Sequence, residues 1–125
     1  MKTQKTILVI EDEKSLRGAI VDILRLKNFL SLEAKNGREG VRLALSKHPA
    51  LILLDIIMPE MDGFGVLEAI RDDDTINSTP VVVMSNLAQE DHLKRAKALG
   101  AKDYIVKSQL TPMDVVKKIK EVLAR

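Results

Sequence analysis

The sequence predicts an α/β fold in which a doubly wound, five-stranded parallel sheet, in strand order 2-1-3-4-5, carries five helices on its two faces. Short apolar runs alternate with longer stretches of helical periodicity, and this alternation occurs five times. Several of the short runs are almost continuously apolar, as expected of parallel strands covered by helices on both sides. The length of 125 residues and the hydrophobic content of 46% suit one core, so we expect a single domain, residues 1–125, without an output domain.

Five apolar runs are the predicted strands. The second run contains Ser31 and Glu33, and this polar content places it at an edge of the sheet. Right-handed crossovers with one reversal of direction give the order 2-1-3-4-5, in which ligands bind beyond the carboxyl ends of the strands, near the reversal. The predicted strands span Thr6–Ile10, Phe29–Ala34, Leu51–Leu54, Pro80–Met84 and Asp103–Val106.

Apolar stripes and end signals mark the helices between these strands. Thr111, Pro112 and Asp114 predict the start of the last helix, as an N-cap, a first-turn proline and an acidic residue that favours the helix dipole. Gly100 ends a fourth helix over Leu87–Leu99 because glycine readily adopts positive φ. The stripes of the first and last helices consist of Leu16, Ala19, Ile20, Ile23 and Leu24, and of Val115, Val116, Ile119, Val122 and Leu123.

The composition excludes several classes of protein. Lys and Arg number 20 and Asp and Glu 18, and the resulting net charge of +2 is too mild to indicate nucleic acid or an anionic membrane as the main partner. The absence of cysteine excludes a disulfide framework and a thiolate metal site. The first apolar run is too short for a signal peptide or a membrane span, so we expect a cytoplasmic protein.

Polar residues at the carboxyl ends of four predicted strands indicate a reactive site. Two carboxylates about 5 Å apart repel by roughly 3 kcal/mol at an effective dielectric near 20, so a group of three requires a cation. Oxygen ligands without His or Cys select a hard ion, for which Mg²⁺ is the expected choice. These residues are Glu11 and Asp12 after the first strand, Asp55 after the third, Ser85 and Asn86 after the fourth, and Lys107 after the fifth.

This set of groups suits phosphoryl chemistry. A carboxylate held beside Mg²⁺ and the ammonium of Lys107 can attack a phosphoryl donor and form an aspartyl phosphate. The Ser85 hydroxyl and the Asn86 backbone N–H are expected to donate to the phosphoryl oxygens. An isolated acidic residue at a strand end is ordinarily a turn residue or a cap, and Asp12 could cap the first helix. It is the joint occurrence of these residues at four strand ends that indicates a functional site.

Four segments in this order resemble the receiver domain of two-component response regulators, including chemotaxis regulators. They are ILVIEDE at Ile7–Glu13, LLDIIMPEMDG at Leu53–Gly63, VVMSN at Val82–Asn86 and GAKDYIVK at Gly100–Lys107. The resemblance implies a flavodoxin-like fold and a signalling switch rather than an enzyme, although such a domain promotes its own phosphorylation and dephosphorylation. The donor would be a histidine kinase or a phosphotransfer protein, and the output a protein partner, since Arg125 closes the last predicted helix.

The resemblance also assigns roles to individual residues. Asp55 would be the phosphoacceptor, Asp12 a direct Mg²⁺ ligand and Glu11 a ligand through water, while the backbone carbonyl of Ile57 would complete the coordination. Lys107 would contact the phosphoryl group. The switch residues would be Ser85, which turns toward the phosphoryl group, and Tyr104, which rotates inward and reshapes the face of helix four, strand five and helix five, where partners dock. The protein would be a monomer or a phosphorylation-dependent dimer.

Some residues depart from the family pattern or only shape the site. Ser108 replaces the proline that usually follows the lysine through a cis peptide, so the Lys107–Ser108 bond is either cis or the loop reorganises. Pro59 stiffens the loop after the third strand, and Gly63 permits a turn before the next helix. Ile57 and Leu87, at positions that influence the attacking water in this family, are apolar, and we expect a long-lived phosphoryl group.

Two other classes of function remain possible on this fold. A phosphohydrolase with an aspartyl intermediate would need a second Asp two residues after the nucleophile, where Ile57 stands. A flavin or nucleotide site would need a phosphate-binding loop after the first strand, where the acidic EDE segment repels phosphate. A receiver-like scaffold without phosphorylation would have lost Asp55 or an acidic ligand, and none is lost.

Overall fold

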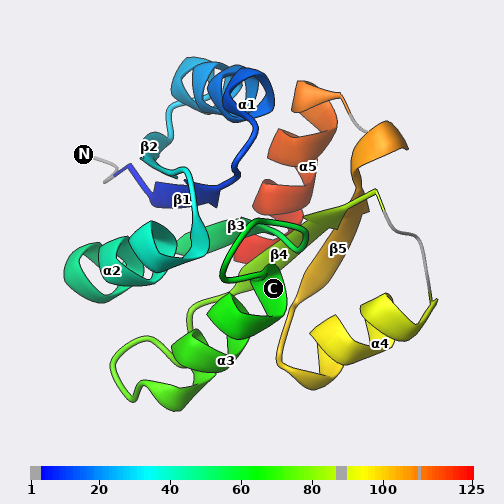
Figure 1. Ribbon diagram of the computed structural model, residues 1–125. Helices are drawn as coiled ribbons and strands as arrows, with labels where there is room; N and C mark the ends of the chain where they lie inside the picture. Colours follow the sequence, from blue (N-terminus) through cyan, green and yellow to red (C-terminus); the bar gives the residue numbers. More distant parts are fainter. Residues whose placement is uncertain (1–3, 87–89, 110) are drawn as a thin grey trace.

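The protein forms a five-stranded parallel sheet in the order β2-β1-β3-β4-β5, which confirms the predicted topology (Figure 1). The computed structural model describes residues 4–86, 90–109 and 111–125. The strands are β1 (Thr6–Ile10), β2 (Leu30–Ala34), β3 (Leu51–Asp55), β4 (Val81–Ser85) and β5 (Asp103–Val106). The helices are α1 (Lys14–Leu26), α2 (Gly37–Lys47), α3 (Gly63–Asp72), α4 (Glu90–Ala98) and α5 (Pro112–Leu123), with a short 3₁₀ helix, η1 (Lys107–Gln109), after β5.

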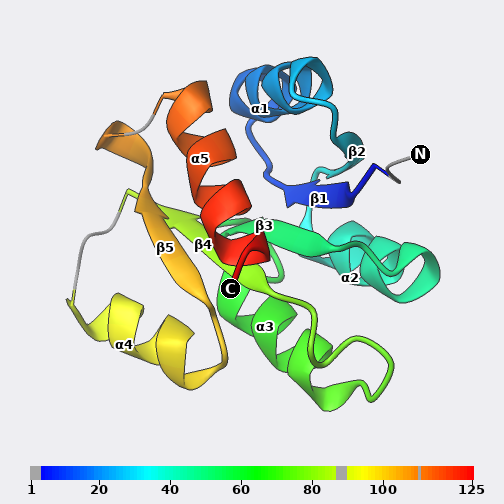
Figure 2. The ribbon, with the colours of Figure 1, turned by 180° about the vertical axis from the view of Figure 1, so that it is seen from behind.

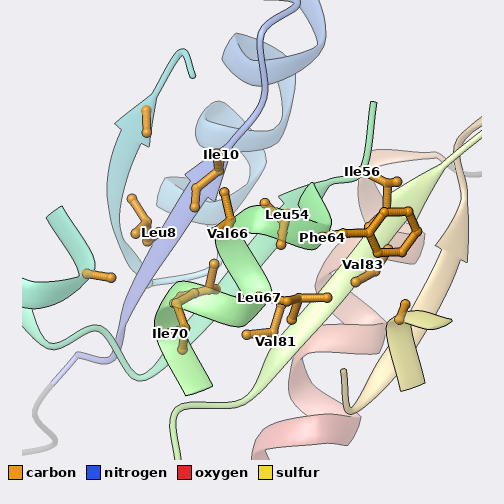
Figure 3. Close-up of a cluster of buried hydrophobic side chains, with 14 of the residues drawn as sticks. Leu8, Ile10, Leu54, Ile56, Phe64, Val66, Leu67, Ile70, Val81 and Val83 are labelled. Carbon is orange, nitrogen blue, oxygen red and sulfur yellow. The ribbon is translucent and has the colours of Figure 1, made fainter. Parts of the chain in front are cut away.

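Helices cover both faces of the sheet because successive residues of each strand point to opposite sides. Ile7 and Val9 of β1 pack under α1 and α5, while Leu8 and Ile10 of the same strand face the opposite layer of α2, α3 and α4. Figures 1 and 2 show these two layers from opposite sides of the molecule. The layer of α2, α3 and α4 packs on the strands through Phe64, Leu67 and other apolar side chains of α3 (Figure 3).

The central strands extend one residue further than the predicted ones. β3 ends at Asp55 and β4 at Ser85, and every residue of both strands is buried. The polar residues at these ends, Asp55 and Ser85, therefore belong to the sheet and are held by its pairing with neighbouring strands. β2 lies at an edge and exposes Glu33, as predicted.

The helix ends follow the predicted signals, with one difference in the stripes. Thr111 and Asp114 form a reciprocal capping box at the start of α5, and Gly100 has a φ of 96° two residues beyond α4. Ala19 is exposed, so the core stripe of α1 includes the buried Val21 instead. Leu87, which we placed in the fourth helix and near the attacking water, lies outside the described residues.

Candidate functional site

The three acidic residues predicted to share a site meet at the carboxyl ends of the neighbouring strands β1 and β3. Each of Glu11, Asp12 and Asp55 offers a carboxylate oxygen, and these oxygens all lie within 4.8 Å of one another. Glu11 is fully buried and Asp55 is 2% exposed, whereas Asp12 lies on the surface. The pairing of Ile10 with Leu54 brings the two strand ends level, so the fold itself gathers these carboxylates.

Lys107 contributes a positive charge to the same group from the end of β5. Its Nζ lies 2.8 Å from Glu11 Oε1 and 3.0 Å from Asp55 Oδ2. The loop that follows contains no cis peptide, so the Lys107–Ser108 bond is trans and the chain turns into η1 at this point. Of the two predicted outcomes, a cis bond or a reorganised loop, the structure has the reorganised loop, which still brings Lys107 to the carboxylates.

One ammonium does not satisfy three carboxylates. Burial raises the pKa of Glu11 to about 8, helped by a hydrogen bond with the Asp55 carboxyl and opposed by Lys107. Burial alone would lower the pKa of Lys107, but its hydrogen bonds to Glu11 and Asp55 outweigh this effect and the pKa is raised. The second carboxylate oxygen of Glu11, Oε2, is buried without a hydrogen-bond partner. A buried oxygen without a donor is costly and would gain from a cation.

The residues present fit a Mg²⁺ site. The donors are carboxylate oxygens, with no histidine among them, which is the ligand set that Mg²⁺ prefers. They line a cleft of about 390 Å³ together with Glu13, Ile57 and Asn86. Since a water molecule takes up about 30 Å³ of the liquid, the cleft has room for a hydrated ion and a phosphoryl group.

The loop between β3 and α3 folds tightly against the site. Gly63 N–H donates to the Ile56 carbonyl at 2.7 Å, and a Cβ at Gly63 would lie 2.6 Å from the Asp55 carbonyl oxygen. Gly63 is thus needed for close approach, and the positive φ of this loop falls on Glu60, at 66°. Pro59 lies exposed in the same loop. Ile57 is 53% exposed, and its backbone N–H donates to Asp55 Oδ1 at 3.3 Å.

The remaining predicted residues lie at the ends of β4 and β5. Ser85 is buried at the end of β4, and the exposed Asn86 lines the cleft beside Asp55. Tyr104 is partly buried against the core layer of α2, α3 and α4. Burial raises the pKa of its phenol, while a hydrogen bond with the Ser85 side chain acts in the opposite direction. The two predicted switch residues therefore contact each other.

Two findings refine the interpretation of the β1 end. Asp12 does not cap α1, because Glu13 occupies the N-cap position and its side chain makes no capping hydrogen bond. Arg17, to which no sequence motif assigns a role, donates from Nη1 to the Glu11 carbonyl oxygen at 2.8 Å. An arginine in the first turns of an amphipathic helix has the pattern of a solvated residue, so the sequence carries no signal for this contact.

Known proteins are similar to this chain in sequence and in fold. The profile of the response regulator receiver domain matches residues 7–120. The transcriptional regulatory protein SrrA of Staphylococcus aureus is 35% identical over 119 residues, which cover 95% of this chain and 48% of that protein. The chemotaxis protein CheY4 of Vibrio cholerae has a TM-score of 0.91 at 25% identity, over 96% of this chain and 99% of that chain. A signal receiver domain of a histidine kinase from Syntrophus aciditrophicus has a TM-score of 0.86 at 28% identity, over 96% and 90% of the two chains.

The match to the family extends over most of the chain, from β1 into α5. The chain spans about half the length of the curated relatives it matches, with 48% of SrrA covered. Within the described residues, no helix has the length and apolar character that crossing a membrane requires. This chain belongs to the family of response regulator receiver domains, the phosphorylation-dependent signalling domains of two-component systems.

Proposed function

We propose that Asp55 accepts a phosphoryl group from a phosphohistidine of a histidine kinase or phosphotransfer protein, with Mg²⁺ bound beside it. The observation that carries this proposal is the meeting of three carboxylates within 4.8 Å, with the Lys107 ammonium 3.0 Å from Asp55. The residues that would hold the ion are Asp12 and Asp55 directly, Glu11 through water, and the backbone carbonyl of Ile57.

The surroundings of Asp55 suit a nucleophile. Both of its oxygens are held, Oδ1 by the Ile57 N–H and Oδ2 by Lys107, so the carboxylate has a fixed orientation on a rigid strand end. Asp55 is almost fully buried but lines the open cleft, so a donor reaches it from the carboxyl side of the sheet. The bound ion would neutralise negative charge on the phosphoryl oxygens.

The transfer step exchanges one bond to phosphorus for another. A carboxylate oxygen of Asp55 forms the new bond, while the bond from phosphorus to the imidazole nitrogen of the donor breaks and that nitrogen keeps the electron pair. Lys107 exchanges part of its contact with Asp55 for a phosphoryl oxygen, and the Asn86 backbone N–H donates to another. These groups act by position and charge, so a small acyl phosphate can serve as donor in place of a protein.

The product would be read through Ser85 and Tyr104. The Ser85 hydroxyl, once it donates to a phosphoryl oxygen, gives up its hydrogen bond with Tyr104. Tyr104 then repacks between β5 and α4, and the face formed by α4, β5 and α5 changes its contacts with a downstream protein. The chain spans about half the length of the curated relatives it matches. Both the kinase donor and the downstream protein are therefore proposed.

A phosphohydrolase on the same fold is the competing function. That chemistry needs a general acid near the nucleophile, and the half-exposed apolar side chain of Ile57 stands at the position where the acid is expected. The signalling role is therefore favoured over turnover.

Intact mass measurement tests the proposal. We expect one added phosphoryl group after incubation with Mg²⁺ and a small acyl phosphate, none in the presence of EDTA, and none in Asp55→Asn. The matched control is Asp103→Asn, which alters an acidic residue of β5 outside the group of three carboxylates and should be labelled like the wild type. An unmodified wild type, or an unchanged adduct in Asp55→Asn, would contradict the proposal.

A further inference from the structure

We infer that Arg17 is a positioning residue for the metal-binding end of β1, where it holds the peptide that joins Glu11 to Asp12. This inference rests on the proposed function, because it assumes that Mg²⁺ binds these acidic residues. The Arg17 guanidinium makes two contacts from α1: Nη1 donates to the Glu11 carbonyl oxygen at 2.8 Å, and Nε lies 3.2 Å from the Glu33 carboxylate on β2.

The contact acts on Asp12 through peptide planarity. The Glu11 carbonyl and the Asp12 N–H belong to one planar unit, so a hydrogen bond that fixes the carbonyl also fixes the plane from which the Asp12 side chain departs. On the other side of Glu11, its N–H donates to the Ala34 carbonyl at 3.0 Å. The backbone on both sides of Glu11 is therefore fixed, by β2 and by Arg17.

Asp12 has particular need of such support. Its carboxylate is exposed, whereas Glu11 and Asp55 are held by burial and by Lys107. Arginine suits this role because its planar fork donates to two acceptors at once, which the single ammonium of lysine does less well. The side chain of Arg17 is only 14% exposed. Because α1 packs along β2, the guanidinium is confined where it bridges the two elements.

The sign of the effect separates positioning from simple charge. A guanidinium near the site repels a divalent cation, so if Arg17 acted only through its charge, removing it would strengthen Mg²⁺ binding. If Arg17 positions Asp12, its removal weakens Mg²⁺ binding instead. Lys14, an exposed cation at the start of α1, is the matched control because its removal changes the charge without touching the Glu11 carbonyl contact.

Calorimetric titration with Mg²⁺ alone tests the inference. We expect the dissociation constant to rise about tenfold in Arg17→Ala, the lower end of what loss of an outer contact to a metal ligand causes. The constant should stay equal or fall in Lys14→Ala. A dissociation constant in Arg17→Ala within twofold of the wild type, or below it, would overturn the inference.

Two further measurements guard against a general loss of structure. Arg17→Lys keeps the charge and one donor, and we expect a smaller rise in the dissociation constant than in Arg17→Ala; equal weakening in both variants would overturn the role of the contact. At saturating Mg²⁺, Arg17→Ala should acquire the phosphoryl group at close to the wild-type rate, whereas general damage would lower that rate and overturn the inference. A wild type that binds no Mg²⁺ would contradict the proposed function, while equal binding by wild type and Arg17→Ala contradicts only this inference.

Discussion

Two groups of charged side chains lie at opposite ends of β5, and they differ in how their charges balance. At the carboxyl end, three carboxylates lie together, and the ammonium of Lys107, which is 13% exposed, pairs with two of them, Glu11 and Asp55. At the amino end, Asp103 Oδ2 lies 3.3 Å from Lys118 Nζ and 2.7 Å from Arg125 Nη2, and Glu121 also approaches Lys118. The inner group, at the carboxyl end, consists of Glu11, Asp12, Asp55 and Lys107 and has an excess of negative charge. The outer group, at the amino end, consists of Asp103, Glu121, Lys118 and Arg125, and its charges are balanced.

The two groups shift carboxyl pKa values in opposite directions. Burial raises the pKa of Glu11 in the inner group. Burial acts in the same direction on Asp103, but the Tyr104 N–H and the two cations outweigh it and the pKa of Asp103 is lowered. A balanced ion cluster stabilises the fold modestly, whereas an unbalanced buried one creates a demand for a cation. The imbalance makes the inner group a candidate site for a cation.

The largest expected contrast is between the two lysines. Lys107→Ala leaves buried carboxylates without their cation and should lower the free energy of unfolding by about 3 kcal/mol, while Lys118→Ala at the more exposed cluster should cost less than about 1 kcal/mol. Urea unfolding in EDTA at pH 8 measures both. Equal losses would remove the distinction between the clusters.

A smaller contrast concerns pH. The pKa of Glu11 is about 8 in the folded protein and near its usual 4.5 when unfolded, so between these values the folded state binds more protons. The stability of the metal-free protein should therefore fall as pH rises through this interval, by at most about 1.4 kcal/mol per pH unit from this group. Unfolding in EDTA at pH 5.5 and 8 measures the slope, which Glu11→Gln should reduce. The same slope in that variant would refute the assignment to Glu11.

The smallest effect is expected at the outer group. Because the pKa of Asp103 is lowered on folding, its contribution is present above the usual carboxyl value and is lost as pH falls through the lowered value. Asp103→Asn should cost roughly 0.5 kcal/mol near pH 7 and nothing at low pH. Thermal melts at pH 7 and pH 3 compare the variant with the wild type, and a deficit that grows on acidification would be the wrong sign.

The sequence was sufficient to predict the sheet order and the meeting of Glu11, Asp12, Asp55 and Lys107. Strand periodicity is a local property of the sequence. The rule that ligands bind beyond strand ends depends only on the topology of the sheet. Neither requires knowledge of side-chain positions. The limits of β3 and β4 differed by one residue because hydrogen bonding to neighbouring strands, rather than apolar character, decides where a strand ends.

Other features depend on contacts that no local pattern encodes. Arg17 reaches the Glu11 carbonyl only because α1 packs against the edge strand. The exposed Ala19 has the same apolar character as a core residue, and only the helix orientation excludes it from the core. The predicted role of Gly63, to permit a turn, was incomplete. A Cβ at this position would collide with the backbone of Asp55 and Ile56, so glycine is required even though its φ is not positive. Such details arise from tertiary packing.

Thermal melting with and without Mg²⁺ tests the central claim, that the inner group holds more negative charge than Lys107 neutralises. We predict that Mg²⁺ raises the melting temperature of the wild type, since the ion binds only the folded state. Without Mg²⁺, Asp12→Ala should melt above the wild type, because it relieves repulsion worth roughly 1 kcal/mol near the surface, and Mg²⁺ should no longer raise its melting temperature. A metal-free Asp12→Ala that melts below the wild type, or that gains as much from Mg²⁺, would contradict the account.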